Sequence, residues 1–161
     1  MTVTSGYSKK SRAYTGKFIV KNVAKYRGDA SNVTYRSSWE VLFMKWCDMT
    51  PAVLEWGSEE IVVPYISPLD NKIHRYFVDF YIKIVDKAGQ IKKYMIEVKP
   101  SKFTRPPIEP KRKTARYWGE VKDYAVNQAK WTSATEFAEE ADCQFLVITE
   151  QDLGLDSRRR P

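Results

Sequence analysis

Long hydrophobic runs, histidine and paired cysteines are scarce or missing in this chain of 161 residues. No apolar run approaches the roughly 20 residues that a helix needs to cross a bilayer, so we expect no membrane-spanning segment. Residues 1–17 carry lysine and arginine but no apolar centre, which argues against a signal peptide. We therefore expect the protein to stay in the compartment where it is made.

The scarcity of histidine and cysteine also bears on metal chemistry. The two cysteines, Cys47 and Cys143, lie far apart and neither belongs to a CxxC pair, and His74 is the one histidine. This set is too small for the usual zinc ligands and argues against a structural zinc site. We expect free, buried thiols in a reducing cytoplasm.

Acidic residues are nearly absent from three segments, although the net charge of the whole chain is only +7. Residues 9–27 hold seven basic residues and no acid, residues 99–116 hold seven against Glu109, and residues 158–160 are all arginine. Solvated surface charge is the usual explanation of such runs, and DNA, RNA and acidic lipid surfaces all attract a basic protein. Interleaved aromatic residues favour contact with a phosphate backbone. The basic residues expected to bind DNA are Lys9, Lys10, Arg12, Lys17, Lys102, Arg105, Lys111, Arg112, Lys113 and Arg116.

Periodicity divides the chain into a basic arm, one domain and a basic tail. Residues 1–32 lack clear periodicity and predict an extended arm, residues 33–153 form the domain, and residues 154–161 form the tail. Ser37 or Ser38 is expected to cap a helix that ends near Met49, before Thr50-Pro51. The residues predicted to form its buried stripe are Trp39, Leu42, Phe43 and Trp46.

The rest of the domain alternates strands with a long helix. Strands are predicted over residues 60–66, 75–85 and 91–99, with a hairpin loop at 86–90 between the last two. The proline-rich stretch 100–110 is expected to be neither helix nor inner strand. A helix over residues 114–141, with a weak point at Gly119, leads to a strand at 143–149 that runs parallel to a neighbour. We expect an α/β fold: a mixed β-sheet flanked by helices.

The hairpin places two acids opposite each other. If Val85 pairs with Ile91, counting outwards sets Asp79 opposite Glu97, and Lys99 projects from the same face. Opposed side chains lie about 4.5–5.5 Å apart at Cβ, and two carboxylates there repel unless a cation or proton lies between them. Mg²⁺ prefers oxygen ligands and could be held here for phosphodiester cleavage, with Lys99 positioning the phosphate or the attacking water.

A hairpin with solvated Asp, Glu and Lys side chains explains the same residues without chemistry. The opposed acids, Pro100 at the strand end and the basic loop weigh against that explanation, but the residues alone leave both interpretations open. Glu40 fits a capping box with Ser37, which is the simpler role for it. Arg36, Gln128 and Lys130 are by default solvated surface residues.

The grouping of Asp79 with Glu97-Val98-Lys99 resembles the active-site core of the PD-D/ExK nuclease superfamily, which has a restriction-endonuclease-like fold. Val78 stands where many members have proline, a residue that is not a ligand. Further motifs are similar to the head-completion nucleases of T-even-like tailed bacteriophages, with a distant likeness to the end-cleaving subunits of transposases. These motifs begin at Gly6, Tyr35, Glu55, Arg75, Ile96, Asn127 and Phe145.

The resemblance implies an endo- and exonuclease that acts when the DNA-filled head is completed and joined to its tail. It implies Glu40, Asp79, Glu97 and Lys99 as catalytic residues, and Arg36, Gln128 and Lys130 as active-site or DNA contacts. Mg²⁺, replaceable by Mn²⁺, would be held by Asp79, Glu97 and the Val98 carbonyl, with Glu40 as a further ligand.

The expected partners are DNA, bound largely without regard to sequence, and capsid or portal and neck proteins. The expected location is the host cytoplasm during assembly, with retention in the virion. Two alternatives stay open: a structural head-completion protein with an inactive nuclease core, and a DNA-binding module whose partner cuts.

Overall fold

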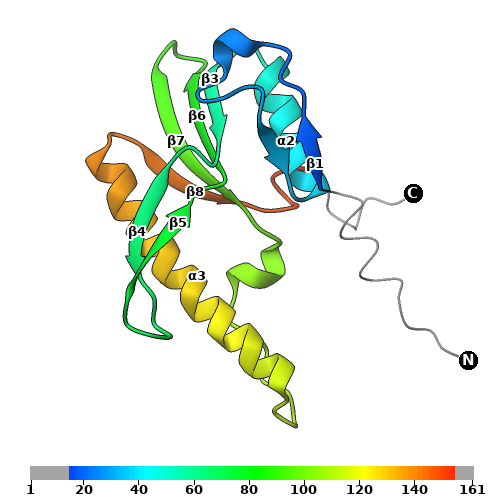
Figure 1. The fold of residues 1–161 in the computed structure, drawn as a ribbon, viewed down its shortest axis with the longest axis vertical. Coiled ribbons are helices and arrows are strands. Elements are labelled where there is room, and N and C mark those ends of the chain that lie inside the picture. Colours follow the sequence, from blue (N-terminus) through cyan, green and yellow to red (C-terminus); the bar gives the residue numbers. More distant parts are fainter. Residues whose placement is uncertain (1–14, 155–161) are drawn as a thin grey trace, which may run out of the picture.

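A four-stranded mixed sheet forms the centre of the structure, a computed structural model that describes residues 15–154 (Figure 1). Its strands run in the order β3 (Val53–Ser58), β6 (Phe80–Val85), β7 (Ile91–Val98) and β8 (Gln144–Ile148). Neighbours are antiparallel except β8, which lies parallel to β7 after a helical crossover, as predicted.

Two helices cover the two faces of this sheet. Ile96 packs in one core with Phe43 and Met44 of α2 (Ser38–Met49), whereas Met95 packs in the other with Ala134 of α3 (Ala115–Glu140). Adjacent residues of a strand point to opposite faces, so α2 and α3 lie on opposite sides of β7. The fold is the predicted one, a restriction-endonuclease-like mixed sheet flanked by helices.

The β6–β7 hairpin has the predicted register, from Val85 paired with Ile91 to Phe80 paired with Ile96. The turn fixes it, because the Asp86 carboxylate accepts hydrogen bonds from the backbone N–H groups of Ala88 and Gln90, both at 2.9 Å. Such a side-chain cap closes the loop at one length. The count that opposes Asp79 and Glu97 therefore starts from the correct pair.

The strand predicted over residues 75–85 is wrong in one respect, because it is broken at Val78 and Asp79. The part before the break, β5 (Ile73–Phe77), pairs with β4 (Val62–Ile66) in a separate two-stranded ribbon. At the break Val78 N–H donates to the Ile61 carbonyl, and the Asp79 carbonyl accepts from Glu59 N–H. These bonds turn the chain between ribbon and sheet, and Asp79 lies on the bend.

Part of the segment predicted as an extended arm is folded onto the domain. Strand β1 (Gly16–Phe18) pairs with β2 (Val33–Tyr35), and the short 3₁₀ helix η1 (Val23–Lys25) lies between them. The buried Asp48 carboxylate accepts from the backbone N–H groups of Lys21 and Asn22 at 2.8 and 3.1 Å. Residues 15–32 thus belong to the folded body. The earlier part of the predicted arm, residues 1–14, and most of the predicted tail, residues 155–161, lie outside the described residues.

Helix α2 has the predicted bounds and cap, and Phe43 is buried as predicted, but Leu42 and Trp46 were wrongly assigned to the buried side. Leu42 and Trp46 are 42% and 47% exposed, and the buried apolar residues are Phe43, Met44 and Cys47. The burial is shifted round the helix because residues 20–22 as well as the sheet pack against it, through Asp48.

Helix α3 runs without a break through Gly119, where prediction placed a weak point, and Thr114 caps it by accepting from Tyr117 N–H. Both cysteines are free, Cys47 buried and Cys143 half-buried. Among residues 15–154, no helix has both the length and the apolar content to cross a membrane.

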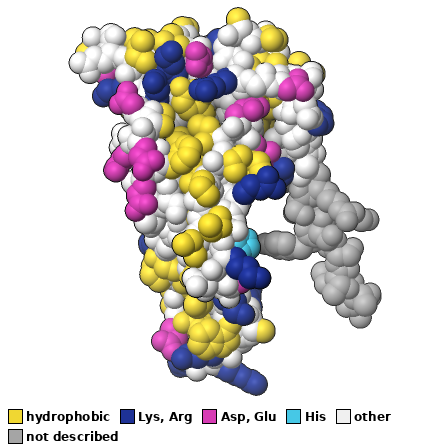
Figure 2. All heavy atoms as spheres, turned by 60° about the vertical axis from the view of Figure 1, so that its left-hand side comes forward, with side chains coloured by type: hydrophobic (Ala, Val, Ile, Leu, Met, Phe, Trp, Pro, Cys, Tyr) yellow, Lys and Arg dark blue, Asp and Glu magenta, His cyan; other side chains and the backbone are white. Residues whose placement is uncertain are grey.

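The first half of α3 extends beyond the sheet (Figure 1). Between β7 and α3 the chain forms a turn of 3₁₀ helix, η2 (Ser101–Thr104), where no helix was predicted, and then a loop of prolines and basic residues. Lysine and arginine side chains gather at the lower end of the molecule, where this loop and the start of α3 lie (Figure 2).

Candidate active site

Asp79 and Glu97 meet where β6 begins and β7 ends. Phe80 of β6 pairs with Ile96 of β7. Asp79 comes directly before Phe80, and Glu97 comes directly after Ile96. The Asp79 carboxylate accepts a hydrogen bond from Val98 N–H at 2.9 Å, which holds it against β7. Lys99 Nζ lies 3.4 Å from Glu97 Oε1. The structure therefore brings together the two acids and the lysine that the hairpin count had grouped.

Glu97 is a buried charged residue, 7% exposed. Its second carboxylate oxygen, Oε2, accepts a hydrogen bond of 2.5 Å from the Tyr76 hydroxyl, and burial together with the neighbouring Glu97 charge raises the tyrosine pKa. The Tyr76 hydroxyl therefore keeps its proton and donates a hydrogen bond to the carboxylate. One oxygen of Glu97 is fixed by this bond, and the other lies toward Lys99.

The electrostatics of the pair are unfavourable without a counter-charge. Burial raises the pKa of Asp79 well above its ordinary value, and the nearby Glu97 carboxylate raises it further. The Val98 N–H bond and the Lys99 charge act in the opposite direction and do not compensate. A proton or a cation beside Asp79 would relieve the repulsion.

The two carboxylates of Asp79 and Glu97 fit a hard divalent cation that takes its remaining ligands from water and phosphate. Asp79 and Glu97 supply two carboxylates at one point, and Mg²⁺ is typically held by one or two carboxylates with water and phosphate oxygens completing its shell. Within residues 15–154 no group of three or more His, Cys, Asp or Glu side chains lies close enough to hold a metal. Glu40 therefore does not form a three-acid cluster with the other two.

Glu40 has the capping role that its sequence context predicts. Its own N–H donates to Ser37 Oγ at 3.1 Å, and its Oε2 accepts from the backbone N–H of Arg36, the residue before the cap, at 2.8 Å, so the arrangement is a variant of the capping box. Glu40 also lines a cavity of about 460 Å³ with Val98 and Lys99. Burial raises its pKa. The same side chain thus caps α2 and faces the space beside Lys99.

Lys130 is brought to the site from α3, whereas Gln128 is not. Lys130 Nζ lies 5.4 Å from the centre of the Tyr76 ring and 5.8 Å from that of Tyr65, a cation–π arrangement. It lines a cavity of about 520 Å³ with Lys99. Gln128 is half-buried and lines neither this cavity nor the one beside Glu40.

The remaining basic residues divide by position. Arg36 borders the cavity beside Glu40, and its guanidinium donates to the Glu59 carboxylate, a bond that raises the arginine pKa. Lys17 donates to Thr34 Oγ1 at 3.1 Å, and Lys102 and Arg105 line a cavity between η2 and α3. Four residues of the loop and the start of α3 are exposed: Lys111, Arg112, Lys113 and Arg116. Lys9, Lys10 and Arg12 lie outside the described residues.

Sequence reasoning missed Tyr76 and Phe103. A straight strand over residues 75–85 puts Tyr76 on the face opposite to Asp79, and only the bend at Val78 and Asp79 lets Tyr76 reach Glu97. Phe103 is one of the aromatic residues interleaved with the basic ones in the sequence, but its position beside Lys99 depends on how η2 folds.

The residues of this site lie in a segment of the chain that is similar to known nucleases. The TnsA-like endonuclease N terminal family matches residues 50–150, which include Asp79, Glu97 and Lys99. The head completion nuclease of Enterobacteria phage T4 is 41% identical over 145 residues, covering 88% of this chain and 94% of that protein. No solved structure matches the chain. The resemblance to phage head-completion nucleases and the more distant one to the end-cleaving subunits of transposases are confirmed, and the chain belongs to the TnsA-like endonuclease family of nucleases.

Proposed function

We propose that this nuclease is a magnesium-dependent deoxyribonuclease that completes phage heads. The observation that carries the proposal is the pair of neighbouring acids, half-buried Asp79 and buried Glu97, with Lys99 beside them, inside the segment that the endonuclease family matches. A carboxylate whose pKa is raised by burial and by a neighbouring carboxylate, as that of Asp79 is, has a chemical use when a divalent cation is bound between the two.

Hydrolysis of a phosphodiester can be assigned to this chain's residues. A divalent ion held by Asp79, Glu97 and the Val98 carbonyl would polarise the phosphate and lower the pKa of a bound water. Lys99 Nζ holds a phosphate oxygen, and Glu40 accepts the proton of the attacking water. The water oxygen bonds to phosphorus while the bond from phosphorus to O3′ breaks, so a 5′-phosphate and, after protonation, a 3′-hydroxyl remain.

Tyr76 and Lys130 support this arrangement. The Tyr76 hydroxyl fixes one Glu97 oxygen, so that the other, which lies beside Lys99, would face the ion, and Lys130 adds positive charge where a phosphate would enter. Arg36 adds a further positive charge at the cavity that Glu40 and Lys99 line. Gln128 is assigned a DNA contact rather than a catalytic role.

The biological setting is proposed from the T4 relative's name. The nuclease would trim or cut DNA, by endo- and exonuclease action, once the head is filled and before it is joined to the tail. It would do so in the host cytoplasm, in contact with capsid or portal and neck proteins, and be retained in the virion. The basic loop and the basic residues near the N-terminus would hold DNA through its phosphates without reading sequence.

Plasmid cleavage tests the enzyme directly. Supercoiled DNA is incubated with the full chain in Mg²⁺, Mn²⁺ or EDTA, and with the variants Glu97→Gln and Glu136→Gln. Glu136 is an exposed glutamate of α3 and serves as the matched control. Nicking that needs metal, is lost in Glu97→Gln and survives in Glu136→Gln supports the proposal. DNA binding without cutting under either metal would favour a structural head-completion protein with an inactive core.

A further inference from the structure

Three cavities meet at the exposed side chain of Phe103. One of about 460 Å³ contains Glu40 and Lys99, a second of about 520 Å³ contains Lys99 and Lys130, and a third of about 480 Å³ lies between η2 and α3. Phe103 lines all three, and 40% of its surface is exposed. The exposed Phe103 ring therefore lies where these cavities meet, next to Lys99, the proposed catalytic lysine.

Hydrogen bonds fix the backbone turn that carries Phe103. Phe103 N–H donates to the Pro100 carbonyl at 2.9 Å, which closes the η2 turn. The turn is fastened to the segment just after β8, because the Glu150 carboxylate accepts from Ser101 N–H at 2.8 Å and from the Ser101 hydroxyl. The same bonds lower the pKa of Glu150. The turn that carries Phe103 is thus fixed by charge-assisted hydrogen bonds at its first residue.

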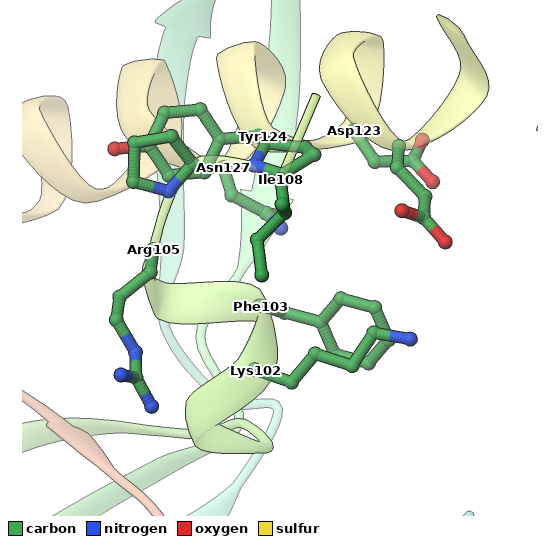
Figure 3. A pocket seen from close by; sticks show the side chains of 10 residues that line it. Lys102, Phe103, Arg105, Ile108, Asp123, Tyr124 and Asn127 are labelled. Carbon is green, nitrogen blue, oxygen red and sulfur yellow. The ribbon is translucent and has the colours of Figure 1, made fainter. Parts of the chain in front are cut away.

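The cavity between η2 and α3 has the chemistry of a nucleobase site (Figure 3). Phe103 and Lys102 extend side by side from η2, with Lys102 Nζ 5.2 Å from the ring centre, and Ile108 lies between η2 and α3. Asn127 adds an amide that can both donate and accept, as base edges require. A ring face for stacking, a polar edge partner and cations for the phosphate occur together in single-strand binding sites.

We propose that Phe103 stacks on an unpaired nucleobase of the DNA strand next to the phosphate that is cut. The preferred substrate is accordingly DNA with a single-stranded or frayed end and not an intact blunt duplex, because a base inside the duplex is stacked on both faces and the terminal pair of a blunt end is still held in line with the helix, whereas an unpaired base can turn out to reach the ring. The inference rests on the proposed nuclease function and names its substrate class. The lysines beside the ring, Lys99, Lys102 and Lys130, favour a nucleic acid over an apolar protein segment as the occupant.

Binding measurements test this without cleavage. The full chain carrying Glu97→Gln is titrated in Mg²⁺ with fluorescent duplexes that have either a blunt end or a three-nucleotide overhang, and affinity is read from anisotropy. Adding Phe103→Ala should weaken binding of the overhang duplex by about 5- to 100-fold, and leave the blunt duplex unchanged. Phe103→Trp should restore the loss, since it retains a stacking face.

Phe77 provides the matched control for an exposed phenylalanine next to a cation. It is 46% exposed, with the Arg75 guanidinium 5.8 Å from its ring centre, and it lines none of the three cavities. Phe77→Ala should bind both duplexes as its parent does. An equal loss in both phenylalanine variants would overturn the proposal.

A second measurement changes the DNA and leaves the residues around Phe103 as they are. Replacing each overhang nucleotide in turn by an abasic one removes the base and keeps the phosphate. One of the three replacements should weaken binding as much as Phe103→Ala does and have no further effect in that variant. If no abasic position matters, base stacking is excluded, even when plasmid is cut. If the wild type with Mg²⁺ or Mn²⁺ cuts neither plasmid nor the overhang duplex, the nuclease assignment fails, while these binding data still decide whether Phe103 takes a base.

Discussion

Asp79 combines a stabilising hydrogen bond with a destabilising charge. Its pKa is raised in the folded protein, so the folded state holds this proton more tightly than the unfolded state does. Stability from that proton is fully present below the ordinary carboxyl pKa and is lost as pH rises through the raised one. In the absence of metal the ionised Asp79 therefore weakens the fold.

Asp79→Asn should stabilise the metal-free protein at high pH. Asparagine keeps an oxygen that accepts from Val98 N–H but carries no charge. We expect the free energy of unfolding in EDTA to rise by about 1–2 kcal/mol at pH 8.5 and to change little at pH 4.5, measured by urea denaturation. Mg²⁺ should stabilise the wild type more than the variant. Equal destabilisation at both pH values would show that the charge does not matter.

Glu40 can be tested for two roles separately. Glu40→Gln keeps an oxygen that accepts from Arg36 N–H, so we expect stability within about 0.5 kcal/mol of wild type but cleavage reduced by about tenfold or more. Ser37→Ala removes the cap and should cost about 1 kcal/mol while cleavage stays within a few-fold. Thermal melts and plasmid nicking measure the two effects. Full cleavage by Glu40→Gln would leave Glu40 as a cap only.

The opposition of Asp79 and Glu97 could be predicted because a short loop fixes the register of a hairpin, and counting outwards from Val85 then needs no tertiary information. The bond between Tyr76 and Glu97 could not be predicted, since it depends on a bend whose hydrogen bonds come from Glu59 and Ile61. Partners supplied by a distant segment leave no local pattern in the sequence.

At the scale of elements, one carboxylate, that of Glu150 in the turn after β8, holds the start of η2. Glu150→Ala should free the turn, lower stability by about 1–2 kcal/mol and speed hydrogen exchange at the amides of Ser101 and Phe103. The amide of Gln90, bonded to Asp86 in the hairpin loop, should exchange as before. Unchanged exchange at Ser101 and Phe103 would mean that the turn holds itself.

The elements that sequence predicted well carry their own local signals. Helix α2 begins at a capping box, α3 at Thr114, and the hairpin at Asp86. The strands it missed, β1, β2 and β3, acquire their structure from distant partners, as when Phe18 and Tyr26 pack edge-on against Trp56. The buried side of α2 was partly missed for the same reason, because residues 20–22 cover part of it.

At the scale of the molecule, the basic loop before α3 lies far from the β6–β7 hairpin (Figure 1). Changing Lys111, Arg112 and Lys113 together to alanine should weaken DNA binding regardless of sequence. The slope of log affinity against log salt should become shallower by about 2–3, the value for that number of lost phosphate contacts. The control changes three lysines of the hairpin, Lys87, Lys92 and Lys93. A salt slope that is the same in both triple variants would exclude the loop from the DNA contact.

The account as a whole depends on a divalent cation between Asp79 and Glu97. Electron paramagnetic resonance of Mn²⁺, titrated into the full chain with a short DNA duplex, counts the bound ions directly. The account predicts Mn²⁺ binding that Mg²⁺ displaces, that Glu136→Gln retains and that Glu97→Gln loses. Binding that is equally strong in Glu97→Gln, or no bound Mn²⁺ in the wild type with DNA, would contradict it.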